Sequence, residues 1–256
     1  MRRTLTGARV ILTGASSGIG RALAVTLAER GCRLLLTARR ADRLEALAAE
    51  LQPFGEAPLL VTGDITTSET RRRLIEAATP WGGLELLVNN AGTGAIGAFE
   101  SASPDRLRQL MEVNFFAPAE LTRDALPLLR AGMHPMVVNM GSVLAHRAVP
   151  MKSEYCASKF ALHGFSDALR AELYPDVDVL HVCPSTTSSE FFEKLLEDTG
   201  EMPRRAGMTP ARVAALTVTA IEKGKHEVIF SWGGKALVWV ERWWPWLADE
   251  LVRRFA

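Results

Sequence analysis

The feature that most constrains the fold is a glycine-rich turn between a short apolar run and a helix-forming segment. Residues 10–12 form the apolar run, and residues 21–30 have the alanine and leucine content of a helix. The turn between them carries Gly14, Gly18 and Gly20. Glycines at such a turn let the backbone approach a pyrophosphate, which faces free amides at the helix N-terminus. The pattern therefore predicts a strand, a phosphate-binding turn and a helix near the start of the chain.

Apolar runs recur along the chain and alternate with helical stretches. Most runs are continuously apolar, which is typical of strands covered on both faces in a parallel sheet. We therefore predict an α/β protein with a doubly wound, mostly parallel, seven-stranded sheet and helices on both faces, the Rossmann fold. Ligands are expected at the carboxyl ends of its strands. The expected strands are residues 8–12, 33–37, 58–62, 84–89, 136–140, 177–182 and 227–231.

Length, charge and cysteine content narrow the class of protein. The chain has 256 residues and no obvious linker, so residues 1–256 are expected to form a single dinucleotide-binding and catalytic domain. A formal net charge of +1 argues against a general nucleic-acid binder. Three cysteines without metal-type spacing predict reduced thiols in a cytoplasmic protein and no metal site. The apolar run of residues 10–12 is too short for a signal peptide.

A second pattern concerns proton transfer. Tyr155 and Lys159 are four residues apart, and Ser142 precedes them. On a helix, positions i and i+4 share a face, so the Lys159 ammonium is expected to lie beside the phenol. An adjacent positive charge would lower the pKa of Tyr155 from its usual value of about 10. The pair by itself would also suit an ordinary amphipathic helix.

Together these motifs resemble the short-chain dehydrogenase/reductase family, in its short single-domain variety. The resemblance extends from about residue 7 to about residue 231. It implies an NADP-dependent oxidoreductase that transfers a hydride between a nicotinamide and a hydroxyl or carbonyl group of a small-molecule alcohol or ketone. The residues that carry it are Gly14, Gly18, Gly20, Asn89, Asn90, Ala91, Gly92, Asn114, Ser142, Tyr155 and Lys159.

The resemblance implies four catalytic residues. Tyr155 would exchange a proton with the substrate oxygen as charge develops there, and Ser142 would hydrogen-bond the same oxygen. Lys159 would lower the pKa of the tyrosine and bind the nicotinamide ribose. Asn114 would keep a helix locally open and hold a water in a proton relay. Capping or turn formation is the alternative role for Ser142, and a purely structural role is the alternative for Asn114.

The residues expected to bind the cofactor follow the ends of several strands. Ala38 stands where an NAD enzyme usually has an acid, and Arg39 follows, so we expect NADP in preference to NAD. An exposed arginine without a ligand is the alternative. Asp64 is expected to bind the adenine amino group or else to cap the turn before Thr66. The full set is Gly14, Ser16, Ser17, Gly18, Ile19, Gly20, Arg39, Asp64, Ile65, Asn90, Ala91, Gly92, Tyr155, Lys159, Pro184, Thr187 and Ser189.

The segment after the sixth expected strand departs from the family pattern. Ser185 stands where the family has glycine, which puts the backbone freedom there in doubt because serine tolerates positive φ poorly. Ser189 replaces a threonine whose hydroxyl it can still supply. Residues 185–207 would form a substrate lid. Its apolar residues, which favour a lipophilic alcohol or ketone, are Phe191, Phe192, Leu195 and Leu196.

Residues 232–256 form a tail unusually rich in tryptophan, with five of the six tryptophans after residue 230. Tryptophan and basic residues on an amphipathic segment are typical of a helix in a membrane interface. The tail has a net charge of only +1 and no apolar run long enough to span a bilayer. We therefore expect it to pack against the body or a sister subunit, with peripheral membrane contact as the alternative.

Two further expectations concern assembly and function class. The resemblance implies a homodimer or homotetramer that pairs through the two helices holding Asn114 and Tyr155. The alternative function is a dinucleotide-binding regulator or scaffold with little turnover, since fold alone does not fix function. The complete set of Ser142, Tyr155 and Lys159 argues against that alternative, because a pure binder would not need the phenol.

Overall fold

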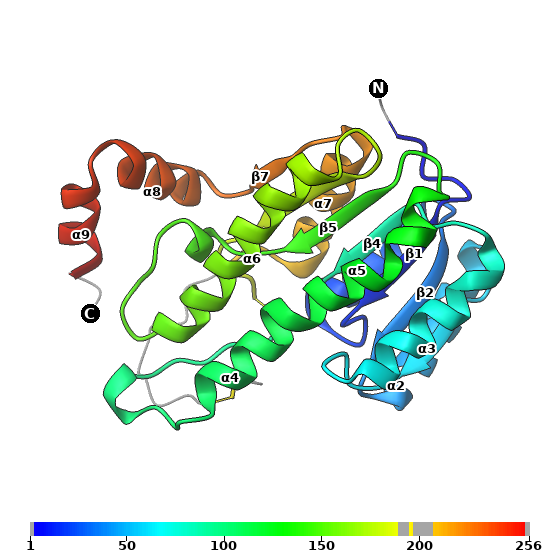
Figure 1. The fold of residues 1–256 in the computed structure, drawn as a ribbon, viewed down its shortest axis with the longest axis horizontal. Coiled ribbons are helices and arrows are strands. Elements are labelled where there is room, and N and C mark those ends of the chain that lie inside the picture. The colour runs from blue at the N-terminus through cyan, green and yellow to red at the C-terminus, as the bar shows by residue number, and fades with distance from the viewer. Residues whose placement is uncertain (1–2, 189–194, 197–206, 254–256) are drawn as a thin grey trace.

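A seven-stranded, entirely parallel sheet organises the protein, as the sequence predicted (Figure 1). The computed structural model describes residues 3–188, 195–196 and 207–253. The strand order is β3-β2-β1-β4-β5-β6-β7. The strands are β1 (Arg9–Thr13), β2 (Arg33–Ala38), β3 (Leu59–Thr62), β4 (Leu86–Asn89), β5 (Met136–Met140), β6 (Asp178–Cys183) and β7 (Glu227–Ile229).

Helices cover both faces of the sheet. α1 (Gly18–Ala28), α2 (Ala41–Leu51) and α7 (Pro210–Glu222) contribute to one apolar cluster. α3 (Ser68–Ala78), α5 (Ala117–Arg130) and α6 (Ser153–Glu172) contribute to the other. The remaining helical segments are η1 (Gln52–Phe54), η2 (Thr79–Trp81), η3 (Phe99–Ser101), α4 (Arg106–Met111), η4 (Glu112–Phe116), η5 (Val143–Ala145), α8 (Trp232–Trp243) and α9 (Pro245–Arg253).

Two predicted strand boundaries were wrong by two residues, for local reasons, and the other strand ends agree within one residue. β4 begins at Leu86, because the amide of Leu84 bonds the carbonyl of Leu128 in the turn before the strand. β7 ends at Ile229, because the Ser231 hydroxyl accepts the Gly234 amide and caps α8. Side-chain and turn bonds thus shortened both strands.

The strand order places a cleft at the centre of the sheet. β1 is flanked by β2 and β4, so the connections from the carboxyl ends of these strands run in opposite directions. The loops there separate, which leaves room for a ligand. The fold therefore brings the glycine turn after β1 beside the loops that follow β4 and β5.

Four polar residues lie in register across β4, β5, β6 and β7: Asn89, Asn139, His181 and Glu227. The first three are buried. Asn89 donates to Asn139 at 2.8 Å, and Asn139 donates to the Ser166 hydroxyl of α6 at 2.9 Å. Ser166 lies 3.3 Å from Nδ1 of His181. Mutual hydrogen bonds therefore offset much of the cost of burying this polar row.

A buried ion pair joins α4 to α6. Arg106 donates from Nε and Nη2 to the two carboxylate oxygens of Glu154, at 2.9 and 2.8 Å. The two side chains are only 1% and 6% exposed. A two-pronged pair of this kind fixes geometry, and removal of one partner leaves a buried charge.

Glu154→Gln should lower the free energy of unfolding by about 3 kcal/mol, because Arg106 would remain buried without its anionic partner. Urea unfolding at neutral pH measures the change. Glu76→Gln is the matched control, since Glu76 pairs with Arg72 on the exposed face of α3 and should change stability little. Equal effects of the two substitutions would contradict a special role for the buried pair.

Candidate active site

The main cleft lies at the carboxyl ends of the strands and has a volume of about 1450 Å³. Residues from the loops after β1, β2, β3, β4, β5 and β6 line it. Every expected cofactor or catalytic residue within the described part of the chain lines the cleft except Asn114, which lies just behind it, and Ser189 falls outside the described residues.

The glycine turn is built to let another backbone or a ligand approach closely. Gly14 has φ +68°, and a Cβ on it would lie 2.8 Å from the Cα of Ala91. A Cβ on Gly20 would lie 2.1 Å from the carbonyl oxygen of Gly14. Thr13 Oγ1 accepts the amides of Asn90 and Ala91, at 3.0 and 2.9 Å. The turn is thus clasped to the loop after β4, and α1 begins at its edge with the N-terminus favourable to a phosphate.

Two arginines line the cleft at the carboxyl end of β2. Arg40 donates to the Ser16 hydroxyl from Nη2 at 2.9 Å and from Nε at 3.3 Å. This contact ties the arginine to the glycine turn. The sequence pattern pointed to Arg39 and not to Arg40, although both follow Ala38. Among the residues lining this part of the cleft, the acid nearest in sequence is Asp64 after β3.

Asp64 lines the cleft and also caps a turn. Its Oδ1 accepts the Thr66 amide at 3.0 Å and the Thr66 hydroxyl at 2.8 Å. The capping alternative is therefore present in the structure, at a residue that still borders the cleft beside Ile65. The two roles are compatible because a carboxylate has two oxygens.

Tyr155, Ser142 and Lys159 converge on the cleft from α6 and the loop after β5. The Tyr155 hydroxyl is hydrogen-bonded to the Ser142 side chain. Ser142 also accepts the Leu144 amide at 3.1 Å and so caps η5. Lys159 is buried and donates to the carbonyl of Met140 at 3.0 Å, with Nζ 5.9 Å from the centroid of the Tyr155 ring.

The expected effect of Lys159 on the pKa of Tyr155 is not found. Burial raises the pKa of Tyr155 to about 12, although the Ser142 hydrogen bond opposes this rise. Burial also lowers the pKa of Lys159 to about 8. The prediction that the ammonium lowers the pKa of the phenol was wrong for this structure, because desolvation is the largest influence on that pKa and the opposing influence comes from Ser142.

Asn114 lies behind the cleft, in the π-helical segment η4, and is 1% exposed. Its Oδ1 accepts the Thr93 amide at 2.9 Å, and its Nδ2 donates to the Thr93 carbonyl at 2.9 Å. Nδ2 also donates to the Ser158 hydroxyl at 3.0 Å. Asn114 therefore holds the loop after β4 against α6, next to Lys159. These hydrogen bonds suit a residue that positions the site from a locally widened helix.

The segment after β6 contributes Pro184, Ser185 and Thr187 to the cleft. Among the described residues other than glycine, only His134 and Met151 have positive φ, so Ser185 adopts an ordinary backbone conformation. Replacement of the family's glycine therefore costs no backbone strain here. Of the expected lid, Leu195, Leu196 and Gly207 line the cleft, while Phe191 and Phe192 lie outside the described residues.

The tail contributes to the cleft in a way the sequence did not predict. Ser231, Gly233, Gly234 and Leu237, at the start of α8, line it. Arg147 bonds Glu241 of α8 at 2.8 Å and Asp249 of α9 at 2.5 Å, which fastens both helices to the loop after η5. α8 and α9 project beyond the sheet (Figure 1).

The tryptophans of the tail lie on its outer surface. Trp232, Trp239, Trp243, Trp244 and Trp246 are 46–86% exposed. Other tail residues, such as Ala248 and Val252, are buried, whereas the indoles are left uncovered. No helix in the described part of the chain is both long and apolar enough to cross a membrane.

The family model for short chain dehydrogenase matches residues 8–200. The chain belongs to this family. It is 32% identical to human Dehydrogenase/reductase SDR family member 7, over 98% of this chain and 79% of that protein. It is 38% identical to 11-beta-hydroxysteroid dehydrogenase 1A of Arabidopsis thaliana, over 84% of this chain and 63% of that protein.

Among solved structures, the chain resembles an alcohol dehydrogenase from the archaeon Thermococcus sibiricus complexed with 5-hydroxy-NADP. The TM-score is 0.78 and the identity 25%, with 86% of this chain and 94% of the other covered. The family is one of oxidoreductases that use a nicotinamide dinucleotide. The glycine turn lines the cleft at the N-terminus of α1, and the free amides there fit the pyrophosphate of such a cofactor.

Lys159→Met should raise the free energy of unfolding at about pH 7 by about 2 kcal/mol. Charge burial at Lys159 costs about 3 kcal/mol, because its pKa is lowered to about 8, and the lost hydrogen bond is worth about 1 kcal/mol. The pKa of Lys159 in the folded protein lies below its unfolded value, so the stability of wild type rises between about pH 8 and about pH 10.5. The difference in stability between the variant and wild type therefore shrinks over this range. Urea unfolding at both ends of this range measures it. A variant less stable than wild type at pH 7 would contradict the argument.

Proposed function

We propose that this protein is an NADP-dependent oxidoreductase that interconverts a hydroxyl and a carbonyl group on a lipophilic small molecule. One observation carries the proposal. The Ser142–Tyr155 pair and Lys159 border the same cleft as the clasped glycine turn. A proton-transfer group and a pyrophosphate cradle thus share one continuous space.

The residues around the cleft divide the work of the reaction. A bound nicotinamide would supply or accept the hydride, and its positively charged oxidised form would favour anions nearby. Ser142 and Tyr155, already hydrogen-bonded to each other, would both bond the substrate oxygen and stabilise its developing charge. Tyr155 would give the proton in reduction, for which its neutral phenol is the right form, and take it in oxidation. Lys159 would bind ribose hydroxyls, and Asn114 would hold the loop after β4 in place.

The apolar surface of the cleft supports a lipophilic substrate. Leu195 and Leu196 of the expected lid and Leu237 of α8 all line the cleft. Apolar lining of this kind binds ligands chiefly by removing their surface from water. The name of the Arabidopsis relative, a hydroxysteroid dehydrogenase, favours a substrate as bulky as a steroid alcohol or ketone.

Assembly of two copies is also part of this proposal. Phe116 on η4 and Phe160 on α6 are each 42% exposed, and the two elements contact each other. These elements hold Asn114 and Tyr155, so a second copy that covers the phenylalanines would support the site from behind. The exposed indoles of α8 and α9 would meet a sister subunit, and a membrane interface is the alternative.

Tyr155→Phe should lower kcat/KM by about 100- to 10,000-fold, because the proton donor is lost, while NADPH binding stays close to wild type. Turnover is measured with a panel of ketones that includes steroids, from the decrease in NADPH absorbance. Tyr174→Phe is the matched control, because Tyr174 is 77% exposed and is the only other tyrosine. Tight NADPH binding without turnover of any ketone by wild type would favour the regulator or scaffold instead.

Arg40→Ala should weaken NADPH binding by about 10- to 100-fold and NADH binding little. The arginine would bond the 2′-phosphate that only NADPH carries, and a charged hydrogen bond is worth about 1.5–3 kcal/mol. Fluorescence titration of both cofactors measures the two affinities. Arg43→Ala is the control, since Arg43 is an exposed residue of α2 that does not line the cleft. An equal loss for NADH would contradict 2′-phosphate recognition.

A further inference from the structure

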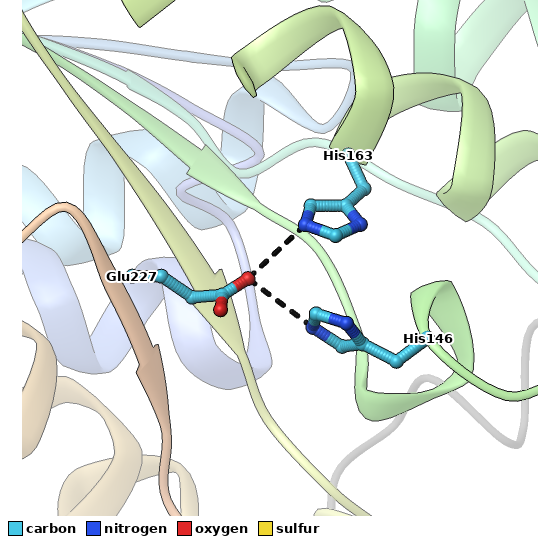
Figure 2. Close-up of side chains that lie close together, drawn as sticks. All are labelled: His146, His163 and Glu227. Atoms are coloured by element: carbon cyan, nitrogen blue, oxygen red, sulfur yellow. Dashed lines mark ion pairs between the residues drawn. The ribbon is translucent and has the colours of Figure 1, made fainter. Parts of the chain in front are cut away.

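Two histidines and a glutamate converge at the edge of the sheet beside the cleft (Figure 2). Nε2 of His146 and Nε2 of His163 each lie 3.2 Å from the same oxygen, Oε1 of Glu227. Each residue offers one potential ligand atom, and these three atoms all lie within 4.8 Å of one another. Figure 2 shows both imidazoles directed at the carboxylate from different elements.

The fold assembles this cluster from three distant segments. His146 follows η5, His163 lies on α6 one turn beyond Lys159, and Glu227 begins β7. Glu227 is the last member of the polar row across the sheet, in register with His181. The arrangement depends on the tertiary fold, because no two of the three residues stand at a metal-type spacing in the sequence.

We propose that His146, His163 and Glu227 bind a divalent transition-metal ion of the Zn²⁺ type. Around a tetrahedral zinc with bonds of about 2.0–2.1 Å, ligand atoms are about 3.3 Å apart. The two nitrogen-to-oxygen distances, both 3.2 Å, match that spacing closely. Two imidazoles and one carboxylate are a ligand set that zinc accepts in proteins, with a fourth position left for another donor.

The surroundings of the cluster suit a transition metal better than Mg²⁺ or Ca²⁺. Sγ of Cys183 lies 3.5 Å from Nε2 of His146, so a soft donor adjoins one of the three ligands. His163 is also hydrogen-bonded to the backbone of Ala145, and such a bond orients a ligating imidazole. The Glu227 side chain is 36% exposed, which gives an ion a path from solvent.

The competing explanation of the cluster is that protonated histidines pair with Glu227 and no metal binds. Hydrogen bonding to Glu227 raises the pKa of His163, since the carboxylate favours a positive charge beside it. A proton on His163 would satisfy the carboxylate and compete with a metal for the same nitrogen. The two explanations differ in whether a metal binds with one-to-one stoichiometry.

A bound ion would brace the loop that carries Ser142. His146 lies in this loop, Arg147 anchors it to α8 and α9, and His163 and Glu227 lie on α6 and β7. An ion would therefore link the loop to the helix that holds Tyr155 without touching the cleft. Its role would be structural, and its loss would act through the position of Ser142.

The test is zinc binding to the full chain, purified free of metal. Equilibrium dialysis against Zn²⁺ near pH 8, with metal analysis, should give one ion per chain for wild type. Glu227→Gln and His163→Gln should each weaken binding at least about 100-fold, since loss of even an outer partner costs 10- to 100-fold. His226→Gln is the matched control, an exposed neighbour of Glu227, and should bind as wild type does.

Two further readouts keep the test independent of folding defects. Co²⁺ should give intense tetrahedral absorption bands with wild type and His226→Gln, and Zn²⁺ but not Mg²⁺ should raise their melting temperatures. Circular dichroism checks that the metal-free variants are folded. Wild-type protein without stoichiometric zinc, or folded Glu227→Gln that binds zinc as tightly as wild type, would overturn the proposal.

Discussion

Burial of the parallel sheet on both faces is the constraint on which the rest of the structure depends. Strands covered by helices on either side must be apolar, so polar groups are placed at the strand ends or must bond one another inside. In the row from Asn89 through Asn139 to His181, the polar groups lie inside and each member is hydrogen-bonded. In the cleft, the polar residues lie on loops at the carboxyl ends of the strands.

The short loop from Ser142 to Arg147 is where the elements of the site meet. Ser142 bonds the Tyr155 hydroxyl, His146 meets Glu227, and Arg147 holds the two C-terminal helices. Three contacts that hold the site together thus depend on the one loop that follows β5. The tail also lines the cleft, because Leu237 lies on α8.

Desolvation sets the electrostatic character of the site. Burial raises the pKa of Tyr155 to about 12 and lowers that of Lys159 to about 8, so it shifts both side chains toward their neutral forms, although Lys159 still carries its charge at about pH 7. In such a site the interaction between a charge that develops on a substrate and the hydrogen-bond donors around it is stronger than in water. Sequence spacing placed the two residues on one helix but carried no information about how dry their surroundings are.

The sequence by itself determined the strands, the glycine turn and the spacing of Tyr155 and Lys159, because these depend on local periodicity and on backbone conformations that only some residues adopt. Only the tertiary structure decided that Arg40 bonds Ser16, that α8 lines the cleft, and that His146 and His163 meet Glu227. Those contacts join segments far apart in the chain, so they depend on strand order and helix packing, which no local pattern of residues records.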